Sequence, residues 1–371
     1  MIVEVDKLGL NLGDLPTPCV LVNLDALERN IQRMADFTKS KNCGLRPHAK
    51  SHKSPFIAKK QIRAGAVGVC CQTLIEAEAM IMNGIDHVLL THNLASEVTI
   101  ERFLGLRKNG DVKILVDGPE NSEILAKAAR HRGVTVDVLV EVNIGNNKAG
   151  QEPGEPAAKF ASWVSRLEGL NFAGLQCYEG NLQLGTPKFE ERKKLAIPAL
   201  EKITSTINAL KKVGLVPEIV SAGGTGTYSI TAGYPGVTEI QPGSYIMMDR
   251  RYSEIEGPGS NFEQSMTVLS TVVSTPNDSK AIIDLGWKAI GVEYEMLGWG
   301  GMPKPLLDGA TYSTGGDEHG ILKFDSPSKR PRVGDKVRLI PAHCDTTLNL
   351  HGVFYCMRNE HVEVVCPIAR R

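Results

Sequence analysis

Residues 43–53 read Cys-Gly-Leu-Arg-Pro-His-Ala-Lys-Ser-His-Lys, and this stretch sets both the fold and the chemistry that we expect. Side-chain alternation predicts a strand over residues 44–48, with Arg46, His48 and Lys50 on one face and Lys53 on the other. If the strand lines a barrel, Lys50 points into the lumen. A partly buried lysine beside cationic groups can lose its charge and form an imine with an aldehyde. A solvated surface loop is the alternative explanation of such a Lys/His run.

The same strand-then-helix pattern recurs along the chain from about residue 17 to residue 245, which is typical of βα units. Helical patterns include residues 24–31 and the long amphipathic segment Phe189–Lys212. Eight such units favour a closed barrel over an open sheet. The predicted strands cover residues 19–23, 44–48, 67–71, 87–91, 113–117, 137–142, 171–176 and 218–221.

A different pattern follows after about residue 260, where β-rich runs come one after another without comparable helices between them. These runs cover residues 265–274, 281–285, 336–340, 353–357 and 362–365. We therefore predict an α/β protein with a (β/α)8 TIM barrel over residues 17–255. Residues 1–16 and 256–371 are expected to form a second, mostly β domain.

The composition is that of a globular protein, with 42% hydrophobic and 23% charged residues among 371. Lys+Arg and Asp+Glu both count 42, so no basic surface for nucleic acid or membrane is indicated, and a small-molecule partner is expected. The eight cysteines lack the spacing of a disulfide framework. No signal-peptide pattern and no run of about 18 apolar residues is present, so we expect a cytoplasmic protein.

A glycine-rich segment, Ser221-Ala-Gly-Gly-Thr-Gly-Thr227, follows a strand late in the predicted barrel. Glycines let backbone N–H groups approach an anion, and late βα loops of barrels often hold phosphate. An ordinary glycine-rich turn is the alternative. Earlier in the barrel, Gln72 ends a strand at a position from which it could reach the lumen.

A possible metal pair lies in the predicted β domain, in the segment Pro341-Ala-His-Cys-Asp-Thr-Thr347. In an extended backbone His343 and Asp345 share one face, and Cys344 points the other way. An imidazole and a carboxylate suit Zn²⁺ or Mn²⁺, with water or substrate completing the coordination. A plain hydrogen bond between the two side chains is the alternative.

Taken together, these motifs resemble those of the D-threonine aldolase and D-serine dehydratase group of pyridoxal-phosphate enzymes. That group has fold type III, the alanine-racemase-like fold. The resemblance spans nearly the whole chain, in order. It rests on Thr17-Pro18 and on residues 46–50, 68–72, 174–180, 223–226, 241–245, 317–320 and 341–351.

The resemblance implies that Lys50 holds pyridoxal 5'-phosphate as an imine. It also implies that His343 and Asp345 bind a divalent metal, Mn²⁺, Zn²⁺ or Mg²⁺, and act with Lys50 in catalysis. A homodimer is expected by analogy. The residues expected around the cofactor are His48, Gln72, Tyr178, Ser221, Gly223, Gly224, Thr225, Ser244 and Tyr245.

The His-x-Asp pattern resembles the aldolase branch, whereas dehydratases of the group tend to carry His-x-Cys. The expected reaction is therefore cleavage of a D-β-hydroxy amino acid, such as D-threonine, to glycine and an aldehyde. Lys148 and Leu184 depart from the aldolase pattern, which usually has arginine and histidine there. A D-serine or D-3-hydroxyaspartate dehydratase releasing ammonia and a keto acid is the alternative, followed by a racemase and a non-catalytic pyridoxal-phosphate carrier.

Overall fold

The structure is a computed structural model that describes residues 7–296 and 301–370. Two compact units are found within it. One unit comprises Gln32–Gly243 and Ile255–Gly257, and we call it the barrel unit. The other comprises the described residues up to Ile31, together with Ser244–Glu254 and Pro258–Arg370, and we call it the β unit. The predicted division at residues 17 and 255 therefore differs from these units at both boundaries.

The barrel unit contains eight parallel strands among its described residues, in the order β2-β9-β8-β7-β6-β5-β4-β3. The two ends of this order meet, because His48 forms a parallel bridge with Cys70 and the Cys70 N–H donates to the Pro47 oxygen at 2.8 Å. The sheet thus closes as predicted. The strands are β2 Gly44–Leu45, β3 Val69–Cys71, β4 His87–Leu90, β5 Asp111–Val116, β6 Val136–Glu141, β7 Leu170–Cys177, β8 Ile219–Ala222 and β9 Glu239–Ile240.

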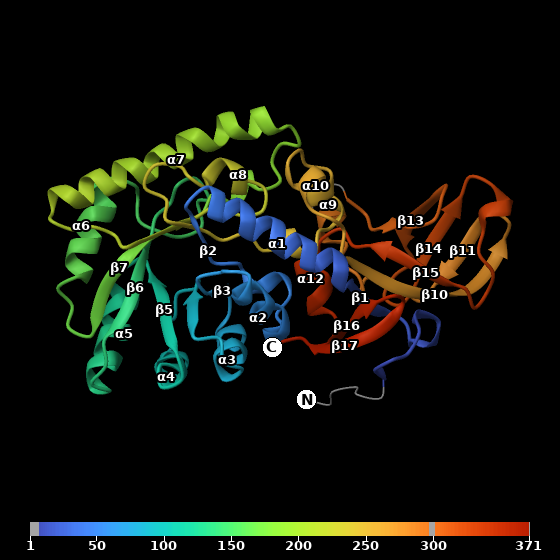
Figure 1. Cartoon of the computed structure of the whole chain (residues 1–371), viewed down its shortest axis with the longest axis horizontal. Coiled ribbons are helices and arrows are strands. Elements are labelled where there is room, and N and C mark those ends of the chain that lie inside the picture. The colour runs from blue at the N-terminus through green and yellow to red at the C-terminus, as the bar shows by residue number, and fades with distance from the viewer. Residues whose placement is uncertain (1–6, 297–300, 371) are drawn as a thin grey trace. The chain divides into compact units, whose positions relative to one another are not determined.

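Helices follow most of these strands along the chain (Figure 1). Buried apolar side chains of these helices and of the strands form one core cluster. Their starts carry recognisable signals: Thr73 and Glu76 form a capping box, and Pro119 opens the helix after β5. The predicted long helix is present with its predicted bounds. The helices are α1 Leu24–Ser40, α2 Pro55–Arg63, α3 Leu74–Met82, α4 Glu97–Leu106, α5 Pro119–His131, α6 Glu155–Val164, α7 Phe189–Lys212 and α8 Tyr228–Thr231.

The lumen of the barrel is filled by a separate apolar cluster, because alternate strand residues face inward. Two positions further along several of these strands the inward residue is polar, as at Gln72, Thr91, Asp117 and Glu141. The fold therefore gathers polar groups at the carboxyl end of the barrel. The apolar cluster consists of Cys70, Leu89, Leu115, Leu139, Ala173 and Ile219.

One predicted barrel strand lies elsewhere. Residues 19–23 form β1 (Cys19–Asn23), which pairs antiparallel with β10 (Met266–Asn277) and parallel with β16 (Val353–Arg358) in the β unit. The eighth barrel strand is β9, which was not predicted because two residues show no periodicity. The predicted strand 44–48 is also short, since Pro47 has no N–H to donate to a ladder.

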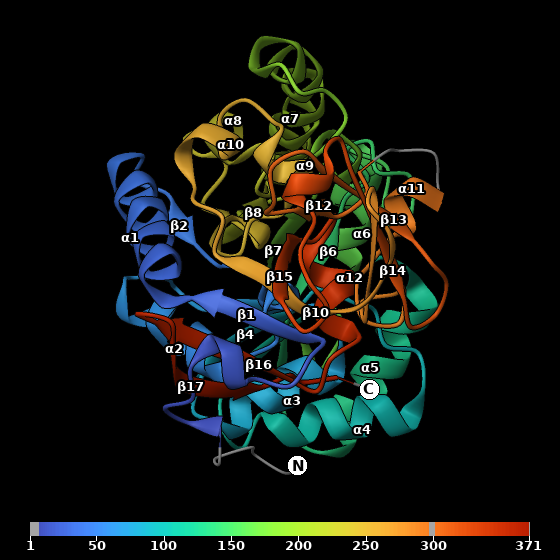
Figure 2. The ribbon, with the colours of Figure 1, turned by 90° about the vertical axis from the view of Figure 1, so that its right-hand side faces the viewer.

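The β unit is built on a nine-stranded sheet with the order β13-β14-β11-β10-β1-β16-β17, in which β15 pairs with β10 and β12. Figure 2 shows β1 between β10 and β16. No described helix in the chain is long and apolar enough to cross a membrane. The remaining elements are α9 Arg250–Ser253, α10 Pro258–Asn261, β11 Lys280–Ile283, α11 Glu293–Met296, β12 Lys304–Pro305, β13 Ala310–Thr314, β14 Gly320–Phe324, β15 Lys336–Ile340, α12 Cys344–Asn349 and β17 His361–Pro367.

Candidate active site

Lys50 lies just beyond strand β2, at the carboxyl end of the barrel. Residues Ala49–Ser51 form a single 3-10 turn. The prediction that strand alternation extends to Lys50 is therefore wrong. His48 precedes this turn. Its Nδ1 lies 3.5 Å from the Lys50 backbone nitrogen, and its Nε2 lies 3.1 Å from Thr91 Oγ1. Lys50 is half-buried.

Lys53 has a different environment, although it is only three residues away. Its Nζ lies 3.2 Å from Glu76 Oε1, and the Glu76 side chain is 1% exposed. The other oxygen of Glu76 accepts the backbone N–H groups of Gln72 and Thr73 at 2.8 and 3.2 Å. Lys53 therefore takes part in a buried ion pair at the start of α3, and Lys50 remains the candidate for covalent chemistry.

Thr91 joins two of the predicted site residues. Gln72 Nε2 donates to the Thr91 oxygen at 3.0 Å, and His48 contacts the hydroxyl of the same threonine. Thr91 Oγ1 also donates to the Cys71 oxygen at 3.1 Å. Thr91, which the sequence analysis did not single out, thus joins the side chains of His48 and Gln72.

Ser221 belongs to a buried polar chain across strands β8 and β9. Its hydroxyl donates to Glu239 Oε1 at 2.6 Å and accepts from Gln241 Nε2 at 2.7 Å. Arg46 pairs with both Glu239 oxygens, at 2.8 and 2.9 Å. Because a cation fixes the carboxylate as an acceptor, the Ser221 proton points toward Glu239.

The glycine-rich loop after β8 is held by side chains of the protein itself. The N–H groups of Gly223 and Gly226 donate to Glu179 Oε2 and Gln183 Oε1 at 3.2 and 2.8 Å. The Gly224 N–H donates to the Thr227 hydroxyl at 3.2 Å. Neither Glu179 nor Gln183 was predicted. Thr225, a predicted cofactor contact, is 2% exposed between these anchored glycines.

Acidic groups lie at the mouth of the barrel beside the predicted site. Burial, together with the charge of Asp117, raises the pKa of Glu141 to about 7. Lys148, which departs from the aldolase pattern, is exposed in the following loop, and Leu184 is half-buried. Tyr178 follows strand β7 and is also half-buried.

His343 and Asp345, the predicted metal pair, lie near each other in the β unit. His343 Nε2 lies 3.8 Å from Asp345 Oδ2, and both side chains are about 15% exposed. Asp345 lies in the first turn of α12, so the extended backbone that was assumed for the pair ends at His343. Ser244 and Tyr245 belong to the same unit, where Tyr245 packs edge-on against Phe262.

Asp249 is the residue of this cluster that the sequence analysis missed. It is fully buried, and its Oδ2 lies 3.1 Å from both His343 Nδ1 and the Cys344 backbone nitrogen. Burial alone would lower the pKa of His343, but the charges of Asp345 and Asp249 outweigh it and raise this pKa. Burial raises the pKa of the Cys344 thiol well above its usual range, so the thiol stays protonated without a metal. Ligand atoms of Asp249, His343 and Cys344 lie within 4.8 Å of one another.

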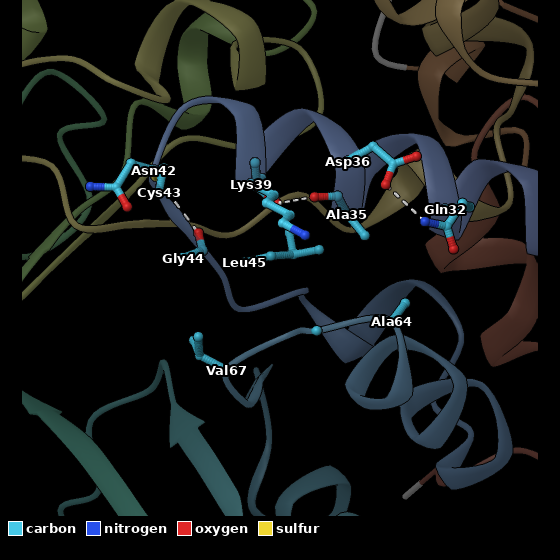
Figure 3. A pocket seen from close by; sticks show the side chains of 12 residues that line it. Gln32, Ala35, Asp36, Lys39, Asn42, Cys43, Gly44, Leu45, Ala64 and Val67 are labelled. Atoms are coloured by element: carbon cyan, nitrogen blue, oxygen red, sulfur yellow. Dashed lines mark hydrogen bonds between the residues drawn. The ribbon is translucent and has the colours of Figure 1, made fainter.

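A hollow of about 440 Å³ opens elsewhere in the barrel unit, between α1 and the segments around β2 and the end of α2. In Figure 3, the side chains of Lys39 and Leu45 lie between α1 and the segment that carries Ala64 and Val67. Gly44 and Val67 come before or at the start of their strands, so this hollow lies at the amino end of the barrel. Its lining includes none of the predicted site residues. The amino face of such barrels usually contributes to stability.

Comparison with known proteins identifies the family. Residues 22–251 match the family model described as "Alanine racemase, N-terminal domain", and residues 265–357 match "Putative serine dehydratase domain". The chain is 35% identical to 3-hydroxy-D-aspartate aldolase of Paracoccus denitrificans (strain Pd 1222), over 98% of this chain and 94% of that protein. The crystal structure of D-threonine aldolase from Filomicrobium marinum aligns with a TM-score of 0.93 and 39% identity, covering 98% of each chain.

A dehydratase is less similar. The D-threo-3-hydroxyaspartate dehydratase of Delftia sp. (strain HT23) is 28% identical over 90% of this chain and 92% of that protein. The fold and these similarities define an alanine-racemase-like protein. Within that class, the chain belongs to the family of lyases that contains the D-threonine and 3-hydroxy-D-aspartate aldolases.

Proposed function

We propose that the protein is a pyridoxal-phosphate- and divalent-metal-dependent aldolase that cleaves a D-β-hydroxy amino acid, such as D-threonine, to glycine and an aldehyde. The observation that carries this proposal is the carboxylate of Asp345 facing Nε2 of His343, because the resemblance associates this pair with the aldolase branch. The greater identity to aldolases than to the Delftia dehydratase supports the same choice.

The barrel unit fits pyridoxal phosphate by its donor chemistry. Lys50 brings an amine to the polar end of a lumen whose middle is apolar, and the buried hydroxyl of Ser221 adds a polar contact. Such a cofactor, when bound, supplies an electron sink for the carbon that loses its substituent. Lys50 would hold the cofactor's aldehyde, and His48 and Gln72 would fix the polar wall beside it. Tyr178, Gly223, Gly224, Thr225, Ser244 and Tyr245 remain proposed contacts.

The β unit offers a site for a divalent ion. His343 and Asp345 would bind it, and Asp249 keeps the Nδ1 proton of His343, which leaves Nε2 with a lone pair for the metal. An ion there would lower the pKa of the substrate's β-hydroxyl. Carboxylate and imidazole donors suit Mn²⁺, Zn²⁺ or Mg²⁺.

A dehydratase is the second candidate, because Leu184 stands where the aldolase pattern expects histidine. Leucine cannot accept the hydroxyl proton whose removal starts aldol cleavage. A dehydratase would release ammonia and a keto acid from D-serine or D-3-hydroxyaspartate. In either case we also propose that the protein is cytoplasmic and forms a homodimer. Light scattering of the purified protein would test the dimer.

Replacing Lys50 tests the proposed cofactor anchor. Lys50→Ala should abolish the visible absorbance band of lysine-bound pyridoxal phosphate, since no other amine takes its place. Lys53→Met is the matched control. It should keep the band while lowering stability, because it leaves the buried Glu76 without its ion pair. An unchanged band in the Lys50 variant would overturn the assignment.

A further inference from the structure

Two segments that lie far apart in sequence share a fully buried hydrogen-bond network in the barrel unit. The first is residues 178–183, which follow strand β7, and the second is residues 223–231, which follow β8. Glu179 is 0% exposed and joins them. Its Oε1 accepts from the hydroxyls of Thr227 and Thr231 at 2.6 and 2.9 Å, and its Oε2 accepts the Gly223 N–H at 3.2 Å.

Gln183 holds the same loop from the next turn of the first segment. Its Oε1 accepts the Gly226 N–H at 2.8 Å, and its Nε2 donates to the Thr227 hydroxyl at 3.0 Å. A Cβ atom at Gly226 would lie 2.0 Å from the Gln183 backbone oxygen, and one at Gly224 would lie 2.6 Å from Oε1. These glycines are therefore required because the first segment packs directly against the loop.

The direction of the central hydrogen bonds is fixed by Thr227. Its oxygen already accepts two N–H groups, from Gly224 and from the Gln183 side chain. Its own proton must then be donated, and Glu179 is the acceptor. A glutamine at position 179 has only one oxygen for donors that now use two, so a buried donor would lose its partner.

We propose that Glu179 is a positioning residue that holds the loop 223–227 in the shape that receives the phosphate group of the cofactor. This inference rests on the proposed function. The amides of Gly223, Gly224 and Gly226 are bound to the protein's own side chains, so they fix the shape of the loop before the ligand arrives. Thr225, which lies between them, would then meet the phosphate in place of these amides. Ordering a binding loop in advance lowers the entropy that binding must overcome.

The experiment compares the affinity of the apoprotein for pyridoxal phosphate with its affinity for pyridoxal, which lacks the phosphate. Each dissociation constant is measured by absorbance titration, in the parent and in Glu179→Gln. The dissociation constant for pyridoxal divided by that for pyridoxal phosphate reports the contribution of the phosphate alone. We expect this ratio to fall about tenfold in Glu179→Gln, as for the loss of one buried hydrogen bond.

Thr231→Val provides a milder variant that should fold even if Glu179→Gln does not. It removes one donor to Glu179 and should reduce the ratio in the same direction. Thr206→Val is the matched control, because Thr206 is equally buried but bonds to the Lys202 oxygen and the Gly154 N–H instead of to the loop. It should leave the ratio unchanged.

An unchanged ratio in both loop variants would overturn the role of Glu179, even if both proteins were less stable. An equal loss of affinity for the two ligands would also overturn it, since a general structural defect does not distinguish them. A parent protein that binds neither ligand through Lys50 would instead overturn the proposed function.

Discussion

At the scale of single residues, the two carboxylate oxygens of Asp249 contact three nitrogen donors, and these contacts determine how His343 is held. Oδ2 faces His343 Nδ1 and the Cys344 N–H, and Oδ1 accepts the Tyr252 N–H at 2.9 Å. Asparagine has one oxygen, so its NH₂ group would face at least one of these donors. The histidine would then lose its fixed tautomer and orientation.

We therefore predict that Asp249→Asn weakens metal binding by about 10- to 100-fold, as is usual when a partner of a ligating histidine is removed. Calorimetric titration of the metal-free protein with Mn²⁺ measures this directly. Glu254→Gln, which changes an exposed carboxylate nearby in sequence, should bind Mn²⁺ like the parent. Equal affinities for all three proteins would show that Asp249 does not support the site.

At the scale of elements, the buried pair of Arg46 and Glu239 joins β2 to β9, two strands of only two residues each. Removing one partner leaves an uncompensated charge in the barrel. Arg46→Met and Glu239→Gln are each expected to lower the free energy of unfolding by about 3–5 kcal/mol, and the double variant by less than the sum. Urea unfolding measures these changes.

The exposed pair of Arg102 and Glu78 is a control with similar geometry. Arg102→Met should leave the free energy of unfolding close to that of the parent, because water screens an exposed pair. An equally small change in the free energy of unfolding for Arg46→Met would show that the buried pair does not stabilise the barrel.

The elements also show what could be predicted from the sequence. Strands such as β5 and β6 are short runs rich in valine, isoleucine and leucine, so the local pattern was enough to find them. The sheet to which β1 belongs depends on β10 and β16, more than 240 residues away, and no local signal records that choice. Glu179 and Asp249 were missed for the same reason, because their partners lie 44 to 95 residues distant.

On the scale of the whole molecule, each proposed group resides in its own unit: Lys50 in the barrel unit, and His343 with Asp345 in the β unit. The proposed reaction needs both, so removing the metal should stop turnover while the absorbance band that depends on Lys50 persists. If turnover survives exhaustive chelation, the metal has no role in the reaction.

Identifying the products formed from D-threonine tests the central claim most directly. The purified protein, supplied with pyridoxal phosphate and Mn²⁺, is incubated with D-threonine and in parallel with L-threonine, and the products are separated and quantified. We predict glycine and acetaldehyde in equal amounts from the D-isomer and none from the L-isomer. Ammonia and 2-oxobutanoate would contradict the account and identify a dehydratase.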